Sequence, residues 1–233
     1  MVRVLLIIPP LLFFSQVICF SSAAIFTLKN NCPYTIWPVT LSTSNSSSSI
    51  AGFSELPSNS TASLPARPEW SGRVWARTGC LLSTSQTTCT TGESPPFTIA
   101  EFNLNQPTDS YDVTLVQGYN VGIGVSASGD GCKYAGCTVD LNMRCPAELR
   151  VVGPDGETTV ACKTPCEALG GDEYCCTGTH STPETCKKTR YSELFKTACP
   201  NAYTYLYDDE SNTFSCGDGA DYLVTFCPSA SSP

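Results

Sequence analysis

Short stretches of this chain alternate apolar and polar residues with the two-residue period of a half-buried β-strand. In IAEFNL at 99–104, the odd-numbered side chains point one way and the even-numbered side chains point the other. The same pattern, or a run of β-branched and aromatic residues, predicts strands at 25–28, 35–41, 71–77, 111–116, 121–125 and 222–226. Many short strands with few helical periods predict a mainly β fold, either a sandwich or a barrel.

Two regions depart from this strand pattern. Residues 42–65 are dominated by Ser, Asn, Thr and Pro, which predicts that part of the segment is a long surface loop. Residues 132–199 are rich in cysteine and poor in apolar residues, which predicts a lobe held by disulfides rather than by a core of its own. In this lobe, a short helix is predicted after Thr164-Pro165, with Glu167 reaching back to the cap and Gly170-Gly171 ending it, and a second helix at 192–198.

The first 23 residues have the pattern of a secretory signal peptide. Arg3 supplies a positive charge, an apolar run follows from 4 to 14, and small residues lead up to a predicted cleavage after Ala23. Because the run is too short to cross a bilayer as a helix, we expect a secreted, extracellular chain without a membrane span.

Cysteine is unusually frequent in this sequence. There are 15 cysteines, and removal of Cys19 with the signal peptide leaves an even number, which predicts seven disulfides formed in an oxidising compartment. The sequence alone leaves the connectivity open. Zinc ligation is not expected, because His180 is the single histidine, predicted to lie in a loop, and the adjacent pair Cys175-Cys176 suits zinc poorly. We therefore expect no metal and no cofactor.

The mature chain is acidic. It keeps all 21 acidic residues and 12 of the 13 basic residues, which is a net charge of −9. Such a chain repels nucleic acid and anionic membranes, so neither is an expected partner. Two acceptor patterns for N-glycosylation, at Asn45 and Asn59, fall in the Ser-rich segment, where we expect both to carry glycans.

Eight segments of the sequence are similar to one known family. They are AIFTLKNNCPYTIWP (24–38), WSGRVWARTGC (70–80), IAEFNL (99–104), YDVTLVQGYN (111–120), RCPAEL (144–149), EYCC (173–176), CPNAYTY (199–205) and DYLVTFCP (221–228). On these segments the mature chain resembles the thaumatin-like proteins, a family of plant pathogenesis-related proteins. The resemblance implies a thaumatin-like β-sandwich core (24–77 with 97–138 and 200–233), a shortened disulfide-bound ribbon (78–96) and a disulfide-rich lobe (139–199), with a cleft between core and lobe.

The resemblance also implies which cysteines pair. The implied disulfides are Cys32–Cys227, Cys80–Cys89, Cys132–Cys216, Cys137–Cys199, Cys145–Cys162, Cys166–Cys175 and Cys176–Cys186. Family members commonly have two further cysteines after the position of Cys89, whereas this chain reads CTTGES at 89–94 and continues directly into Pro95-Pro96. One disulfide loop of the family is therefore missing, with both of its cysteines absent together.

The family's cleft is lined by one Arg, one Glu and three Asp. Arg73, Glu101 and Asp112 match the first three positions, whereas Gln117 and Asn201 stand where the family has its other two aspartates. We therefore predict a binding cleft formed by these five residues. The alternative is that Glu101 is an ordinary residue of the sheet surface that only pairs with Arg73.

Three functions fit these residues. The first is a secreted, antifungal plant defence or stress protein whose cleft binds β-1,3-glucan or a related fungal or plant wall polysaccharide without significant turnover, because amides bind sugar hydroxyls but do not raise the pKa of a neighbouring acid. The second is a weak endo-β-1,3-glucanase that uses Glu101 and Asp112 as its two carboxyl groups. The third is an extracellular inhibitor that binds a foreign protein. In each case we expect a monomer in the apoplast.

Overall fold

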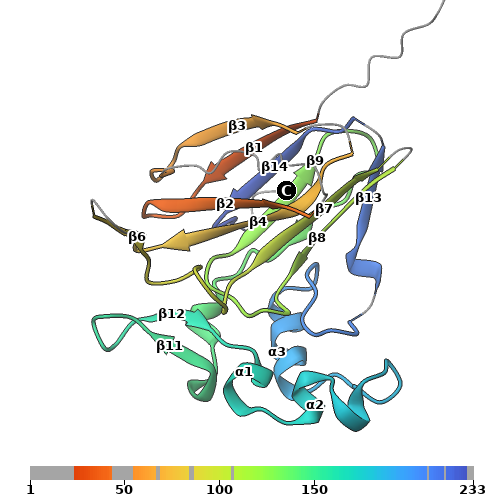
Figure 1. The fold of residues 1–233 in the computed structure, drawn as a ribbon. Helices are drawn as coiled ribbons and strands as arrows, with labels where there is room; N and C mark the ends of the chain where they lie inside the picture. The colour runs from red at the N-terminus through yellow and green to blue at the C-terminus, as the bar shows by residue number, and fades with distance from the viewer. Residues whose placement is uncertain are drawn as a thin grey trace, which may run out of the picture.

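The computed structural model describes residues 24–43, 55–66, 69–83, 87–105, 108–208, 210–217 and 219–229. The predicted signal segment and Asn45 lie outside these residues. Two five-stranded β-sheets form a sandwich, and a lobe of short helices and turns lies at one end of it (Figure 1). The fold is therefore mainly β, as the strand pattern predicts.

The first sheet brings the start and the end of the described chain side by side. Its strands lie in the order β10 (Ala135–Gly136), β9 (Ile123–Ala127), β14 (Tyr222–Phe226), β1 (Ile25–Asn30) and β3 (Thr61–Pro65). β1 runs parallel to β14 and antiparallel to β3. The sequence pattern does not predict β3, because its residues TASLP continue the Ser- and Thr-rich composition of the surrounding segment and the strand depends on pairing with β1.

The second sheet carries the residues of interest for function. Its strands lie in the order β13 (Phe214–Gly217), β8 (Thr108–Thr114), β7 (Ile99–Asn105), β4 (Ser71–Thr78) and β2 (Ile36–Ser42), and all neighbours are antiparallel. Buried and half-buried residues alternate along β4, so that Val74 and Ala76 face the first sheet while Arg73 and Trp75 face away from it. The outward face of this sheet is therefore free to carry polar side chains.

Aromatic side chains fill the space between the two sheets. Phe26 from β1 meets Phe102 from β7 edge to face, with ring centres 4.8 Å apart, and Tyr222 from β14 contacts both rings. Such pairs stabilise a core by about 0.5–1.5 kcal/mol beyond the area that they bury. Gly72 leaves room for the buried ring of Trp70, because a Cβ at position 72 would lie 2.3 Å from that ring.

The segment between β8 and β9 crosses from the second sheet to the first. The sequence indicates a tight connection at Gln117-Gly118, and the structure shows why a glycine is needed at position 118. Gly118 has a φ of +93°, and a Cβ on it would lie 2.4 Å from the Cβ of Pro96. Asn120 anchors the crossing, because its buried Nδ2 donates hydrogen bonds to the Ala76 carbonyl and to Thr91 Oγ1, each at 2.9 Å.

The shortened ribbon lies beside β4. Its hairpin consists of β5 (Leu81–Leu82) and β6 (Thr87–Thr88), and the Cys80–Cys89 disulfide closes it. The chain then returns over the second sheet, where Trp75 Nε1 donates a 2.9 Å hydrogen bond to the Gly92 carbonyl. This return segment covers one end of the outward face of β4.

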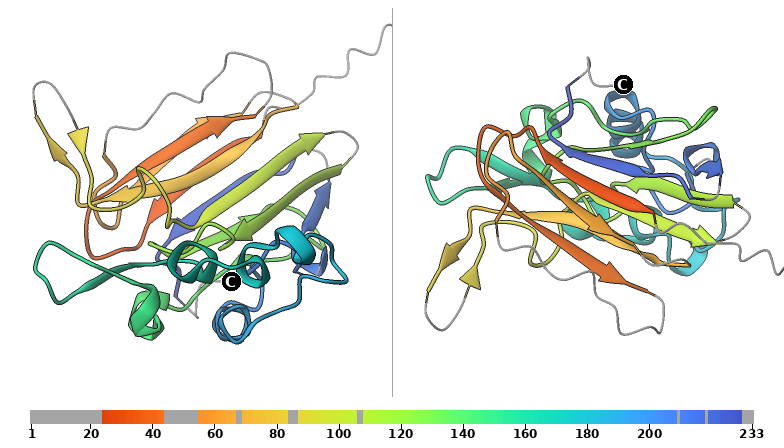
Figure 2. Two further views of the ribbon diagram at one scale, coloured as in Figure 1. Left: turned by 60° about the horizontal axis from the view of Figure 1, so that its bottom comes forward. Right: turned by 90° about the horizontal axis from the view of Figure 1, so that it is seen from above.

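The lobe lies at one end of the sandwich, as Figure 2 also shows from a second side. Its elements are η1 (Leu141–Arg144), η2 (Ala147–Leu149), β11 (Arg150–Val152), β12 (Thr159–Cys162), α1 (Pro165–Leu169), α2 (Asp172–Cys175), η3 (Gly178–His180) and α3 (Arg190–Ala198), and η4 (Glu210–Asn212) follows in the returning chain. His180 ends the 3-10 turn η3, whereas the sequence analysis expects it in an irregular loop.

The two helices predicted in the lobe are present with one difference each. Thr164 caps α1, and its Oγ1 accepts a hydrogen bond from the backbone N–H of Glu167 at 3.1 Å. The Glu167 carboxylate does not reach back to the cap as expected, since it pairs with Lys163 at 3.6 Å. α3 begins two residues earlier than predicted, because Thr189 and Ser192 form a reciprocal capping box in front of Arg190.

Seven disulfides join the fourteen cysteines from Cys32 to Cys227. The pairs are Cys32–Cys227, Cys80–Cys89, Cys132–Cys216, Cys137–Cys199, Cys145–Cys162, Cys166–Cys175 and Cys176–Cys186. These are the same pairs that the family resemblance implies. Three of them lie within the lobe, where α1 and α2 have no buried residue, so cross-links hold much of this part of the lobe.

Candidate functional site

Three charged side chains stand in a row across the outward face of the second sheet. Arg73 on β4 lies directly opposite Glu101 on β7, and Glu101 lies directly opposite Asp112 on β8. Directly opposed residues on neighbouring antiparallel strands have Cβ atoms about 4.5–5.5 Å apart and point to the same face. The strand register therefore brings together three of the five residues that the sequence analysis places in the cleft.

Arg73 and Glu101 form an ion pair at the open end of this row. The Arg73 Nε atom lies 2.6 Å from Glu101 Oε1, and the two side chains are 42% and 34% exposed. An exposed pair of this kind contributes only about 0–1 kcal/mol to folding. Stability alone is therefore a weak reason for its presence, and both side chains remain accessible to a ligand.

Asp112, at the other end of the row, has a raised pKa. Burial raises the pKa of its carboxyl group to about 7, the neighbouring Glu101 carboxylate raises it further, and Arg73 opposes the shift. Its Oδ1 atom has no hydrogen-bond partner within the described part of the chain. At neutral pH, Asp112 is consequently present both as an acid that is able to donate a hydrogen bond to a ligand and as a carboxylate that is able only to accept one.

A second row, of neutral polar residues, runs beside the charged row. Ser71, Asn103 and Ser110 oppose one another on the same three strands, two positions along from the charged residues. Ser71 Oγ donates a 2.6 Å hydrogen bond to Asn103 Oδ1. The sequence analysis misses this row, although the two-residue period of the strands would have found it from the positions of Arg73 and Glu101.

The two rows line one shallow pocket of about 370 Å³, which we call the sheet cleft. Its lining consists of Thr43, Ser71, Gly72, Arg73, Glu101, Phe102, Asn103, Ser110 and Asp112. Hydroxyl, amide, carboxyl and guanidinium groups alternate within it, so the surface offers both hydrogen-bond donors and acceptors. Such a surface suits a neutral ligand with many hydroxyl groups.

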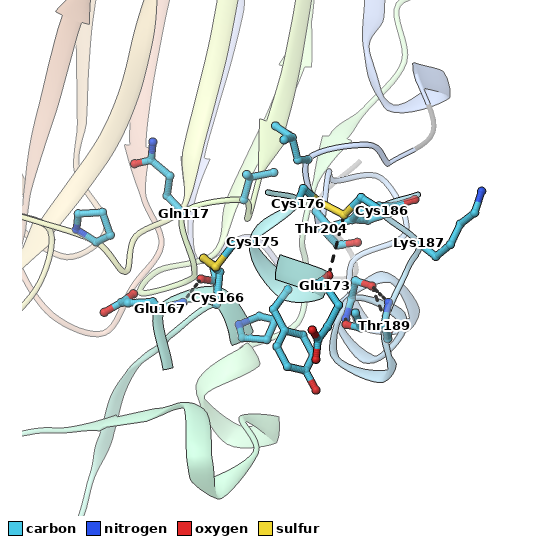
Figure 3. A pocket seen from close by; sticks show the side chains of 18 residues that line it. Gln117, Cys166, Glu167, Glu173, Cys175, Cys176, Cys186, Lys187, Thr189 and Thr204 are labelled. Atoms are coloured by element: carbon cyan, nitrogen blue, oxygen red, sulfur yellow. Dashed lines mark hydrogen bonds between the residues drawn. A yellow bond between two sulfur atoms is a disulfide. The ribbon is translucent and has the colours of Figure 1, made fainter. Parts of the chain in front are cut away.

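Gln117 lines a different pocket of about 340 Å³ between the core and the lobe, which we call the lobe pocket. Figure 3 shows Gln117 on the core side of this pocket, with Glu167, Glu173 and Lys187 on the lobe side. The Cys166–Cys175 and Cys176–Cys186 disulfides also border it. The sequence analysis does not identify these lobe residues, because they approach Gln117 only through the tertiary fold.

Asn201 lies apart from both pockets. It is exposed, its carbonyl accepts a 2.8 Å hydrogen bond from the backbone N–H of Gly136, and it is not among the residues that line the sheet cleft or the lobe pocket. The structure therefore does not gather the five predicted residues into one pocket. Because Gln117 and Asn201 lie outside the sheet cleft, the amides at these two positions do not change the row formed by Arg73, Glu101 and Asp112.

Within the residues that the structure describes, no three His, Cys, Asp or Glu side chains are grouped closely enough to hold a metal ion. Over the same residues, no helix is long and apolar enough to cross a membrane. Both observations concern only that part of the chain.

The fold and the site together define a disulfide-rich β-sandwich protein with a polar cleft on one sheet. The chain belongs to the thaumatin family, whose model matches residues 30–228. The resemblance drawn from the sequence segments is thereby confirmed.

Named relatives are similar to this chain over most of its length. Pathogenesis-related protein 5 of Arabidopsis thaliana is 48% identical over 218 residues, which covers 87% of this chain and 90% of that protein. A protein of Prunus avium named glucan endo-1,3-beta-glucosidase is 44% identical over 225 residues, covering 88% and 91%. A solved β-1,3-glucanase domain from Clostridium beijerinckii superposes with a TM-score of 0.58 and 9% identity, covering 88% and 98%, and shows the same fold.

Proposed function

We propose that this protein is a secreted plant defence protein that binds β-1,3-glucan, or a closely related wall polysaccharide, in the sheet cleft without significant turnover. The observation that carries the proposal is the pair of rows on three neighbouring strands, one charged and one neutral, which line a single open pocket. Homologues named as pathogenesis-related proteins and the seven disulfides are consistent with an extracellular defence role.

Binding is favoured over hydrolysis by the arrangement of the two carboxyl groups. Glycoside hydrolysis uses an acid and a second carboxylate that flank the scissile bond. Here Glu101 and Asp112 are cross-strand neighbours on one face of one sheet, and Glu101 is already paired with Arg73. A glucan chain lying on this face meets both groups from the same side, which suits hydrogen bonding to its hydroxyls.

Retention on insoluble β-1,3-glucan tests the proposal. The wild type should be retained, and Glu101→Gln should bind about tenfold more weakly, because it loses a charge-assisted hydrogen bond while keeping its shape. Its melting temperature should barely move, since the ion pair is exposed. Glu193→Gln is the matched control, because it removes the exposed Lys188–Glu193 pair elsewhere on the surface.

Two results would contradict glucan binding in the sheet cleft. If the folded wild type is not retained, the cleft does not bind this polysaccharide, and capture of a foreign protein by the intact chain would then favour the inhibitor function. If Glu101→Gln changes the stability but leaves retention unchanged, Glu101 serves only as the structural partner of Arg73.

The weak endo-β-1,3-glucanase is the second candidate, and the raised pKa of Asp112 is the observation in its favour. A carboxyl group with a pKa of about 7 is able to donate a proton near neutral pH, while Glu101 beside it would act as the second group. Reducing-sugar release from soluble β-1,3-glucan separates the two functions. Steady release that both Glu101→Gln and Asp112→Asn abolish would establish the enzyme, whereas our proposal expects no release above the level of these variants.

A further inference from the structure

A third pocket, lined by polar and aromatic side chains, lies where the core, the ribbon and the lobe meet. We call it the junction pocket, and its volume is about 540 Å³. Its lining consists of Tyr34, Thr35, Trp37, Thr78, Gly79, Thr90, Asp140, Asn142, Met143, Pro154, Thr158, Thr159 and Val160. It shares no lining residue with the sheet cleft or the lobe pocket. A volume in this range suits a small ligand rather than a single water or ion.

The apolar part of the lining is made by side chains that stand open to the solvent. Tyr34 is 43% exposed and Met143 is 80% exposed, and the half-buried Trp37 lies at the start of β2. Aromatic rings of this kind offer a flat apolar surface together with a polar edge. A ligand that covers them therefore needs an apolar face of its own.

The polar part of the lining selects against anions. Threonine side chains come from the residue before β2, from β4, from the ribbon and from the β11–β12 hairpin, and Asp140 adds the single charged side chain of the lining. Partial burial raises the pKa of Tyr34, and the Asp140 carboxylate raises it further. With a carboxylate and no basic residue among its described lining residues, the pocket favours a neutral ligand over a phosphate or a uronic acid.

Two polar atoms in the wall of the pocket have no hydrogen-bond partner within the described residues. They are Trp37 Nε1, a donor, and Asn142 Oδ1, an acceptor, and both are shielded from bulk water. A buried polar atom without a hydrogen-bond partner destabilises the empty pocket, so a ligand that supplies the partner is favoured. A hydroxyl group carries both the acceptor that the indole N–H lacks and the donor that the amide oxygen lacks, whereas an ammonium group has no acceptor to offer the indole N–H.

The walls of the pocket are held in place from behind. Asp140 Oδ1 accepts a 3.0 Å hydrogen bond from the backbone N–H of Asn142, and Asn142 Nδ2 donates to the carbonyls of Asn120 and Val160. The Cys80–Cys89 disulfide adjoins Gly79 and Thr90 on the ribbon side. A site that is formed before the ligand arrives loses less entropy on binding.

From this combination we propose that the junction pocket is a second saccharide-binding site, which takes one or two pyranose rings of a neutral oligosaccharide. The apolar C–H face of a pyranose ring covers Tyr34 and Trp37, and its hydroxyls exchange hydrogen bonds with Asp140, Asn142 and the threonines. The site is independent of the sheet cleft, and its existence does not require that the cleft bind glucan.

The experiment screens the Glu101→Gln protein, whose sheet cleft should bind about tenfold more weakly than that of the wild type, on an immobilised panel of neutral glucan, xylan, mannan and chitin oligosaccharides. At least one of these should be retained, and its affinity is then measured by calorimetry. Trp37→Ala and Tyr34→Ala, each made in the Glu101→Gln background, should weaken the affinity about tenfold, because each removes an aromatic surface. Val152→Ala is the control, since Val152 is exposed on β11 of the same hairpin but does not line the pocket.

Three results would overturn this proposal. The first is that the Glu101→Gln protein retains none of the panel, which confines binding to the sheet cleft or denies it altogether. The second is that folded Trp37→Ala and Tyr34→Ala proteins bind as tightly as the Val152→Ala control. The third applies if Trp37→Ala does not fold, in which case Tyr34→Ala and Trp37→Phe decide, and unchanged affinity in both removes the site.

Discussion

At the scale of single residues, the structure separates groups that the sequence treats alike. Glu101 and Asp112 are both acids at matching cleft positions, yet the raised pKa belongs to Asp112, while Glu101 forms an exposed ion pair. The sequence analysis names both acids as the carboxyl groups of the glucanase alternative and does not say which of them would donate the proton. Burial, which depends on the fold, makes Asp112 the group whose protonation changes near neutral pH.

Asp112 should make the stability of the protein depend on pH. Its folded-state pKa of about 7 lies above the ordinary value of 3.8, so its contribution to stability is fully present below about pH 4 and is lost as the pH rises through 7. Asp112→Asn does not titrate and avoids this loss. The variant should gain stability relative to the wild type as the pH rises, by on the order of 4 kcal/mol at pH 8.

Chemical denaturation of both proteins at a series of pH values from 4 to 8 measures this difference. The free energies of unfolding should diverge between about pH 4 and 7 and run parallel above that range. A difference that stays constant over the whole series would mean that Asp112 ionises in the folded protein as easily as in water.

Asn59 is the glycosylation acceptor that lies within the described residues. It is exposed in the turn before β3, with a φ of +61°, and its backbone N–H donates to the Asn30 carbonyl. We expect protein made in a plant to carry a glycan there, because the pattern sits on an accessible turn of a chain predicted to be secreted. Intact mass before and after glycosidase treatment measures it, and Thr61→Ala should remove one glycan while Thr87→Ala should not.

At the scale of elements, the register of the strands sets the positions of the site residues, whereas capping residues and disulfides hold the short helices of the lobe. The antiparallel register of β4, β7 and β8 places each charged residue opposite the next and the neutral row two residues away. A slip of one residue in any of these strands would turn its polar side chains into the core. In the lobe, by contrast, most helices are shorter than two turns and depend on their ends and on disulfides.

Thr189 should matter more to the lobe than an ordinary exposed threonine. Its side chain accepts a hydrogen bond from the backbone of Ser192, and α3 buries Tyr191 and Phe195 beneath it. Thr189→Ala should lower the free energy of unfolding by about 1 kcal/mol, because it leaves a helix N–H without a partner. Denaturant unfolding measures the loss, with Thr88→Ala on the exposed β6 strand as control. Equal effects of the two substitutions would contradict the role of the cap.

At the scale of the whole molecule, cross-links join parts of the chain that are far apart in sequence. Cys32–Cys227 ties the strand β1 region to the end of β14 across a separation of 195 residues, and Cys137–Cys199 ties the two ends of the lobe region across 62. Such links act largely by limiting the freedom of the unfolded chain, so their effect grows with the length of the loop that they close.

Loss of the longest cross-link should destabilise the protein strongly. Replacing Cys32 and Cys227 together by serine should lower the free energy of unfolding by roughly 2–5 kcal/mol. Replacing Cys80 and Cys89, which close a loop with a separation of 9, should cost less. A larger loss of stability from the ribbon pair than from the long-range pair would show that local strain outweighs loop entropy.

Thiol titration of the denatured wild type should find no free thiol in the mature chain.

Local patterns in the sequence were enough to predict the mainly β class, most of the strands, the start of α1 and the family, because alternation and capping depend on neighbouring residues. The family resemblance, and not the strand pattern, singled out Arg73, Glu101 and Asp112 as cleft residues. The sequence did not predict β3, because that strand exists only through its pairing with β1. Only the tertiary structure separated Gln117 and Asn201 from the charged row, and only the tertiary structure formed the junction pocket from five segments of the chain. The physical reason is that strand register, burial and contacts between distant segments are properties of the folded chain and leave no local pattern in its sequence.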